Sequence, residues 1–252
     1  NGYLVRSETF SNHKKLGNPV AQLERYNDWD VDELIYIDIT KDGDYRDQRT
    51  DLGGSKFNSV NSIEDIIKEI ASKCFMPITF GGGIRTLEDA RIRFELGADK
   101  ITINSQAIRE PEIITSLAEE FGSQAVIVSI DALQLPNKKY AVYSNWGAEN
   151  TGKNADEWAR EAQERGAGEI FINSISADGT ASGYDLSLIR LIVESTSIPV
   201  IACGGVGDYS DFEIAIQETG VTAVAAGNIF NFKELSYPLA KKHLKNRGLN
   251  FR

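Results

Sequence analysis

The sequence predicts an α/β fold in which short buried strands alternate with amphipathic helices. Seven short apolar runs, most of them rich in β-branched residues, are separated by segments with helical periodicity. Strands of this kind are apolar along their whole length because helices cover both faces of a parallel sheet. Two stretches of the first half also recur in the second half, which indicates two related halves. Together these observations predict a (β/α)8 barrel that forms a single domain over residues 1–252.

The expected elements follow one another in a regular order, with no linker between them. The strands are LIYID (34–38), PITF (77–80), KITIN (100–104), AVIVSID (125–131), EIFIN (169–173), PVIAC (199–203) and TAVAAG (222–227). The helices are expected in SIEDIIKEIASKC (62–74), RTLEDARIRFEL (85–96), EPEIITSLAEEF (110–121), NADEWAREAQERG (154–166) and DLSLIRLIVEST (185–196).

The internal repeat sets the number of strands. "DELIYIDITKDG" (32–43) aligns with "GEIFINSISADG" (168–179), and "PITFGGGI" (77–84) aligns with "PVIACGGV" (199–206). The two offsets differ by 14 residues, which predicts an extended polar loop within residues 41–62, and a loop of this length is usually functional or mobile. Two halves of four strands make eight. The first strand is expected to be largely missing, because the chain opens at "NGYLVRSETF", which is typical of the hairpin that follows a strand.

Composition limits the partners. A formal net charge of −10 argues against nucleic acid or an anionic membrane as the main partner. There is no apolar stretch of membrane-spanning length and no signal peptide, so a cytoplasmic protein is expected. Cys74 and Cys203 lie in or beside apolar runs and are expected to be small buried side chains in a reducing compartment. No Cys or His spacing indicates a metal site, and no cofactor is expected.

Glycines end two equivalent strands. Gly82 and Gly83 follow the strand at 77–80, and Gly204 and Gly205 follow the strand at 199–203. Backbone N–H groups at such turns, close to helix N-termini, form anion sites. In each half the next strand ends in small polar residues, which are Asn104 and Ser105 in the first half and Gly227 and Asn228 in the second. The two copies predict two phosphate sites and a long substrate with a phosphate at each end; the alternative is a pair of bare tight turns.

Acidic residues also end strands, where the active sites of barrels form. Asp131 ends an otherwise apolar run, which favours catalysis over a structural ion pair. Asp38 could take part directly or support another residue, and Asp178 could cap a turn or bind a substrate hydroxyl. At the opposite ends of strands, Glu33, Lys100 and Glu169 are expected from their spacing alone to form a stabilising layer of salt bridges.

These residues resemble a known family, the cyclase subunit of imidazole glycerol phosphate synthase. The stretches that carry the resemblance cover most of the chain from Gly17 to Arg252; they are "DELIYIDIT", "FGGGIRTLEDA", "LGADKITINSQAI", "FGSQAVIVSIDA", "RGAGEIFINSISADGTASGYD" and "ACGGVG". The resemblance implies that ammonia from a partner glutaminase attacks a substrate with two phosphates. The products would be an imidazole and an aminoimidazole carboxamide ribotide.

The resemblance also implies roles for individual residues. Asp131 is one of two aspartates that act as acid and base, and the other falls before Asn1. The charged gate through which ammonia enters, at the barrel face that the glutaminase binds, falls on Glu33, Lys100 and Glu169. The residues that would bind the phosphorylated substrate are Arg6, Asp38, Gly82, Gly83, Asn104, Ser105, Asp178, Gly179, Thr180, Gly204, Gly205, Gly227 and Asn228.

Two other functions stay open. "ASKCFMPITFGGGI" and "LVRSETF" resemble a divergent branch that is thought to supply ammonia for an acetamidino group on a surface-polysaccharide sugar. A barrel that only binds and activates the glutaminase is the second alternative, since a fold does not fix a function.

Overall fold

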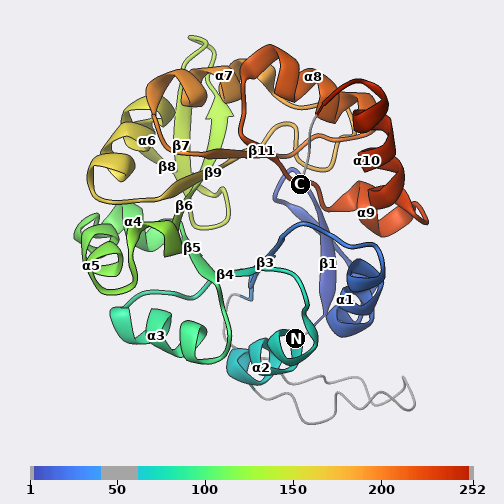
Figure 1. Cartoon of the computed structure of the whole chain (residues 1–252). Coiled ribbons are helices and arrows are strands. Elements are labelled where there is room, and N and C mark those ends of the chain that lie inside the picture. The colour runs from blue at the N-terminus through green and yellow to red at the C-terminus, as the bar shows by residue number, and fades with distance from the viewer. Residues whose placement is uncertain (1–2, 41–61, 250–252) are drawn as a thin grey trace. The chain divides into compact units, whose positions relative to one another are not determined.

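The computed structural model describes residues 3–40 and 62–249, and its strands and helices alternate along the chain (Figure 1). The strands are β1 (Leu4–Glu8), β2 (Asn12–Gly17), β3 (Leu34–Ile37), β4 (Ile78–Gly81), β5 (Lys100–Ile103), β6 (Val126–Gln134), β7 (Tyr140–Ser144), β8 (Glu149–Asn154), β9 (Glu169–Ser174), β10 (Val200–Cys203) and β11 (Ala223–Val224). The α-helices are α1 (Pro19–Asp28), α2 (Ile63–Lys73), α3 (Leu87–Glu95), α4 (Ser105–Arg109), α5 (Glu112–Phe121), α6 (Ala155–Glu164), α7 (Leu186–Ser195), α8 (Tyr209–Thr219), α9 (Asn228–Phe232) and α10 (Ser236–Asn246). This order of elements is that of the (β/α)8 class, which confirms the predicted fold class.

The chain divides into two compact units, residues 1–5 with 15–101 and residues 6–14 with 102–252. In the first unit, β3 and β4 are parallel neighbours, with Leu34 opposite Ile78 and Ile37 opposite Gly81. Helices α1 and α2 pack on this pair because each presents one apolar face to it. The core they share consists of Val20, Leu23, Ile66, Ile67, Ile70, Met76, Ile78 and Phe80.

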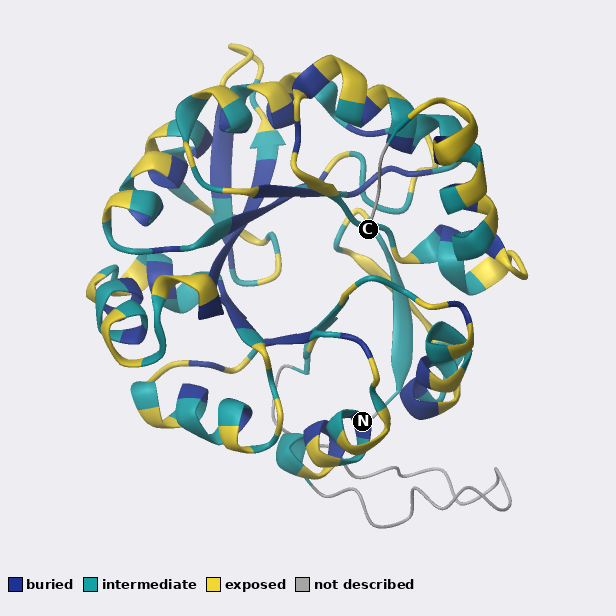
Figure 2. Ribbon diagram, in the orientation of Figure 1, coloured by how far each residue is buried: buried dark blue, intermediate teal, exposed yellow. Residues whose placement is uncertain are grey.

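In the second unit, β6, β9, β10 and β11 lie side by side in parallel. The register places Asp131 of β6 opposite Asn173 of β9, and Cys203 of β10 also opposite Asn173. β6, β9 and β10 are almost wholly buried (Figure 2), which explains why their sequences are apolar without alternation.

All seven predicted strands are confirmed, most of them to within a residue or two at each end. β6 extends three residues further than predicted, and β11 has only two residues. The hairpin of β7 and β8 was not predicted, because "YAVYS" is short and "ENTGKN" is polar. The predicted hairpin near the start of the chain is formed by β1 and β2, whereas residues 41–61 of the predicted long loop lie outside the described residues.

The two-fold repeat is visible in the helix caps. Thr86 caps α3 and Asp208 caps α8, and each begins a capping box that is completed by an aspartate three residues later. Asp89 Oδ2 accepts from the backbone N–H groups of residues 85 and 86, and Asp211 Oδ2 accepts from those of residues 207 and 208. An aspartate at the equivalent position, Asp89 or Asp211, therefore fixes the turn after the glycine-ended strand in each half.

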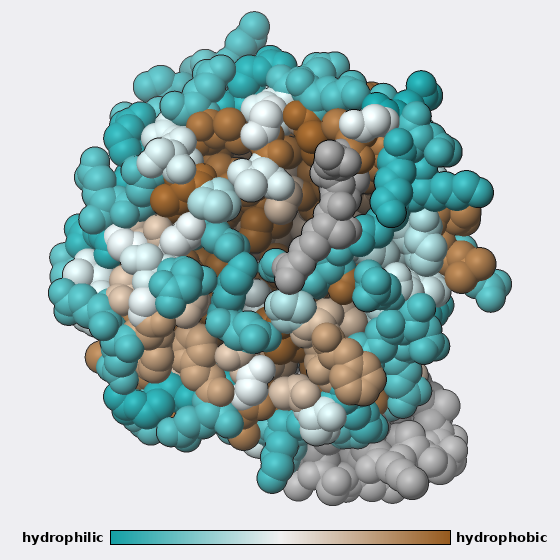
Figure 3. All heavy atoms as spheres, viewed as in Figure 1, coloured by the Kyte–Doolittle hydropathy of each residue, from teal (hydrophilic) through white to brown (hydrophobic). Residues whose placement is uncertain are grey.

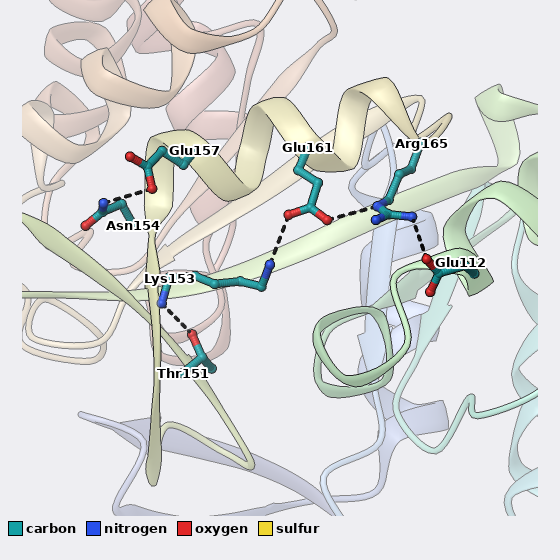
Figure 4. Close-up of polar contacts among 7 residues, drawn as sticks. All are labelled: Glu112, Thr151, Lys153, Asn154, Glu157, Glu161 and Arg165. Atoms are coloured by element: carbon teal, nitrogen blue, oxygen red, sulfur yellow. Dashed lines mark hydrogen bonds and ion pairs between the residues drawn. The ribbon is translucent and has the colours of Figure 1, made fainter.

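A chain of charged side chains ties the β7–β8 hairpin to two helices (Figure 4). Lys153 Nζ at the end of β8 is 2.9 Å from Glu161 Oε2 of α6, and Glu161 Oε1 is 3.0 Å from Nε of Arg165, which also bonds Glu112 of α5 at 3.2 Å. Although burial acts to raise it, the pKa of Glu161 is lowered by the hydrogen bonds from Lys153 and Arg165. The outer surfaces of α6 and α7 are hydrophilic (Figure 3), as expected for helices that cover a sheet.

Close backbone approach predicts a graded response to alanine at two glycines. Gly205 has φ +103°, and a Cβ there would collide with the carbonyl oxygen of Gly183. Gly220 has φ +70° in open space. We expect Gly205→Ala to lower the free energy of unfolding by about 3 kcal/mol or more, because a steric clash adds to the left-handed backbone. Gly220→Ala should cost about 1 kcal/mol.

Urea unfolding of both variants measures the difference. Equal losses of stability would show that the turn around Gly205 can relax away from Gly183.

Candidate active site

Asp131 lies near the carboxyl end of β6 and is the most deeply buried of the predicted site carboxylates. Its residue exposure is 9%. Asn104, which directly follows β5, donates from Nδ2 to Asp131 Oδ2 at 2.8 Å. The predicted catalytic residue and a predicted binding residue are thus in direct contact.

The surroundings of Asp131 change its acidity. Burial raises the pKa of Asp131 to about 7; the negative charge of Asp178 acts in the same direction, and the Asn104 hydrogen bond opposes it. A carboxyl group with a pKa near neutrality can both take and give a proton. The site can therefore perform general acid or general base catalysis at physiological pH.

Two buried carboxamide oxygens lie around Asp131. Within residues 3–40 and 62–249, no donor bonds to Oδ1 of Asn104 or to Oδ1 of Asn173. Buried acceptors are nearly always satisfied, so these oxygens indicate a ligand with N–H or O–H donors. Sequence reasoning missed Asn173 as a site residue; the available signal was a polar residue at a strand end in register with Asp131.

The second glycine turn directly adjoins this group. Gly204 and Gly205 have φ values of +94° and +103°. A Cβ on Gly204 would lie 2.6 Å from Asn173 Oδ1, so only glycine lets the turn approach the end of β9 this closely. Gly227 and Asn228 begin the short helix α9 after β11, as Asn104 and Ser105 begin α4 after β5.

Asp178 and Gly179 support the tip of the β1–β2 hairpin. The carbonyl oxygen of Asp178 accepts from Thr9 N at 2.9 Å, and its carboxylate accepts from Phe10 N at 3.4 Å. A Cβ on Gly179 would collide with Ser7 O, and Asn228 Nδ2 donates to the same oxygen at 3.3 Å. Asp178 therefore fixes a hairpin distant in sequence, and both roles expected for it, capping its own turn and binding a substrate hydroxyl, stay predictions.

The other predicted residues of this unit take local positions. Arg6 forms an ion pair with Glu8, and its guanidinium carbon lies 5.4 Å from the ring centre of Phe232. Thr180 Oγ1 donates to Ala177 O at 2.8 Å. Ser105 Oγ accepts from Asn145 N at 3.0 Å.

The first glycine turn has the same construction in its own unit. Gly82 and Gly83 have φ values of +89° and +68°. A Cβ on Gly82 would collide with the backbone of Asp38, whose N–H donates to Gly81 O at 2.9 Å. The Asp38 carboxylate accepts from Thr40 N at 3.0 Å.

Glu33, Lys100 and Glu169 lie at the amino ends of strands, as expected. Glu33 directly precedes β3 and Lys100 begins β5, and Lys100 Nζ is 3.4 Å from Glu33 Oε2. Glu169 begins β9 in the other unit, opposite Ile127 of β6. Glu33 and Lys100 thus form an ion pair, and the gate role of the three residues stays a prediction.

Cys203, at the end of β10, is not an activated nucleophile. Burial raises the pKa of its thiol to about 12, with a further contribution from Asp178. A thiol with this pKa stays protonated at neutral pH. Of Cys203 and Asp131, only Asp131 can change its protonation state near neutral pH.

The fold and the repeated turns define the class of protein, an α/β barrel protein built from two related halves. A family model described as "Histidine biosynthesis protein" matches residues 1–236. The chain is 40% identical over 251 residues to "Imidazole glycerol phosphate synthase subunit HisF" of Hydrogenobaculum sp. (strain Y04AAS1). It is 39% identical over 251 residues to the protein of the same name from Alkaliphilus metalliredigens (strain QYMF). Both alignments cover 100% of this chain and 94% of the relative. The chain belongs to the histidine biosynthesis protein family, and its likeness to HisF subunits extends over its whole length.

None of the helices in the described ranges combines the length and the apolar character that crossing a bilayer requires.

The raised pKa of Asp131 predicts a dependence of stability on pH. An unfolded aspartate ionises near pH 3.9 and the folded Asp131 near 7, so folding stability falls as pH rises from about 4 to about 7 and is level above that range. Asp131→Asn removes this dependence. Relative to the wild type, the variant should gain up to about 4 kcal/mol between pH 4 and pH 8.

Urea unfolding of both proteins at pH 4.5, 5.5, 6.5 and 8 measures the gain. A difference between the two proteins that does not change with pH would show that Asp131 ionises normally.

Proposed function

We propose that this protein is the ammonia-dependent cyclase subunit of an imidazole glycerol phosphate synthase. The observation that carries the proposal is the buried Asp131 carboxyl group, bonded to Asn104 and placed beside one of two equivalent glycine turns. The full-length likeness to HisF subunits supports it. The substrate would be a formimino ribotide with a phosphate at each end.

The glycine turns would bind the phosphates. Gly204 and Gly205, with Gly227 and Asn228, would bind one phosphate through backbone N–H groups, and the equivalent turn at Gly82 and Gly83 would bind the other. Asp178, Gly179 and Thr180 follow β9, the strand that pairs with β10, and would contact the substrate beside the Gly204–Gly205 turn. Arg6 would contribute a positive charge, and Asp38 would orient the first turn through its backbone contact with Gly82.

Asp131 would move the protons of the reaction. Ammonia attacks the substrate, the ring closes to an imidazole, and aminoimidazole carboxamide ribotide leaves. Both steps need proton transfer at nitrogen and oxygen atoms, for which a pKa of about 7 is suited. Asp131 would act with a second acid–base group, which the resemblance places before Asn1. The free carboxamide oxygens of Asn104 and Asn173 would accept from the substrate's N–H and O–H groups.

The amino ends of β3, β4 and β5 would form the face for a glutaminase subunit. Glu33 and Lys100 pair there, and Pro77 O accepts from Leu34 N at 3.0 Å. Phe75 lies two residues before Pro77 and is 88% exposed. The side chain of Asn27 donates to Lys73 O at 2.7 Å and accepts from Phe75 N at 3.1 Å, so this exposed ring is carried on a fixed backbone. A rigid exposed aromatic next to charged groups is typical of an interface anchor.

The role of Asp131 predicts a large loss of turnover. The protein would be given the bis-phosphate formimino ribotide and ammonium ion, and the loss of substrate would be followed. Asp131→Asn should lower kcat by a factor of about 100 to 10,000, the range for loss of a general acid or base. The limb of the pH profile with a midpoint near 7 should disappear. Asp156→Asn, a change in the first turn of α6, is the matched control.

The other outcomes separate the alternatives. A folded wild type without turnover would favour the ammonia-supplying subunit of acetamidino-sugar synthesis. Full turnover in Asp131→Asn would refute the acid–base role of Asp131. A wild-type protein that has no turnover of its own but still activates a glutaminase subunit would favour the docking scaffold.

The proposed face predicts two distinguishable defects with a glutaminase subunit. Lys100→Ala should leave ammonium-dependent turnover intact and lower the yield of product per glutamine hydrolysed, because ammonia would escape. Phe75→Ala should instead weaken subunit affinity by about tenfold or more, with normal coupling at saturating partner. Calorimetry and paired assays of glutamate and product measure both effects. Normal coupling in Lys100→Ala would remove its gate role, and unchanged affinity in Phe75→Ala would move the interface elsewhere.

A further inference from the structure

The turn between β7 and β8 has an unusual backbone. Asn145, Trp146 and Gly147 have successive φ values of +52°, +57° and +75°. Two non-glycine residues in the left-handed region are unfavourable, and such strain persists where the surroundings fix it, often at functional sites. Asn145 Nδ2 donates to Glu149 Oε1 at 3.1 Å and Ala148 N donates to Ser144 O at 3.1 Å, so the turn is also held from within.

One side of this turn is fixed to the end of β5. Asn145 N donates to Ser105 Oγ at 3.0 Å. Ser105 follows Asn104 directly, and Asn104 bonds the carboxylate of Asp131. The turn is therefore linked to the Asp131 carboxylate through Ser105 and Asn104, by one hydrogen bond at each end of this pair.

The other side of the turn reaches the end of β9. A Cβ on Gly147 would lie 3.5 Å from Cδ1 of Ile175 and 3.4 Å from Cβ of Phe10. Ile175 N donates to Ala132 O, which is the residue after Asp131 on β6. Since Ser105 lies on one side of this part of β6 and Ile175 on the other, the turn crosses the strand that carries Asp131. Trp146 is the middle residue of that crossing.

Trp146 is 38% exposed, whereas the other two tryptophans, Trp29 and Trp158, are 7% and 1% exposed. A large aromatic side chain on a rigid turn has little conformational entropy to lose when a ligand packs on it. The chemical partner that best matches the face of an indole is a flat aromatic ring.

We propose that Trp146 stacks on the planar heteroaromatic ring of the phosphorylated ligand and so selects ligands that carry such a ring. This inference rests on the function proposed above, because the glycine turns supply the phosphate binding. The β7–β8 turn positions the ring of the ligand over β6, and the Gly204–Gly205 turn of the same unit binds a phosphate. Trp146 is a specificity residue and takes no part in proton transfer.

Ligand pairs that differ only in the ring test the proposal. Aminoimidazole carboxamide ribotide has a ring and one phosphate, and ribose 5-phosphate has the same sugar and phosphate without the ring. Acrylamide quenching of the wild type reports Trp146, because the other two tryptophans are buried. The ribotide should shield Trp146 from acrylamide, and ribose 5-phosphate should leave it accessible.

Variants then measure the contribution of the indole. Trp146→Leu should weaken binding of the ribotide about tenfold and that of ribose 5-phosphate by less than about twofold, and Trp146→Phe should restore most of the difference. Ile214→Ala changes another exposed apolar side chain, on α8, and should change neither affinity.

Each outcome bears on one of the two proposals. Equal weakening of both ligands by Trp146→Leu, or no shielding of Trp146 by the ribotide, would overturn the stacking role. Ammonium-dependent turnover is assayed in parallel. Turnover with wild-type kcat/KM in Trp146→Leu would support the cyclase function and refute the stacking role. If Trp146→Leu weakens only the binding of the ribotide and the wild type has no turnover, the stacking role is supported and the cyclase function is refuted.

Discussion

Close approach between backbones at the ends of parallel strands is the constraint on which the rest of the structure depends. Gly82 lies against the backbone of Asp38, and Gly204 lies against Asn173 and the backbone of Ser174. A side chain at either glycine would push the turn away from the neighbouring strand. Because the turns can lie this close, the helices α3 and α8 begin directly behind them, and their capping boxes fix the start of each helix near the strand ends. The candidate anion sites follow from this local geometry in both halves.

Burial of Asp131 works against the stability of the fold. The surrounding strand is apolar, and the nearest charge is another carboxylate, so the ionised form is disfavoured. A structural role would be served better by an apolar residue at this position. Retention of a carboxyl group here is typical of the conflict between stability and activity at functional sites.

The sequence was sufficient to predict the strands, because parallel strands are buried on both faces and cannot be confused with surface segments. It also predicted the glycine turns at Gly82 and Gly204, since the internal repeat marked them. It did not predict β7 and β8, whose stability comes from pairing with β6 and from the Lys153–Glu161–Arg165 contacts rather than from local propensity. Trp146 and Asn173 were missed for a related reason: their importance arises from contacts between segments distant in sequence.

The capping boxes have a consequence for the order of folding. The cap behind each glycine turn is closed by contacts within residues 85–89 and 207–211, and short loops of this kind close in about 10–100 ns. The contact between Asn104 and Asp131 spans 27 residues, and the contact between Phe10 and Asp178 spans 168. Contacts of high sequence separation form late, because loop closure must come first. The chain therefore acquires the caps behind the glycine turns early from local contacts, whereas the approach of the glycines to neighbouring strands and the acidity of Asp131 are set only when distant strands come together.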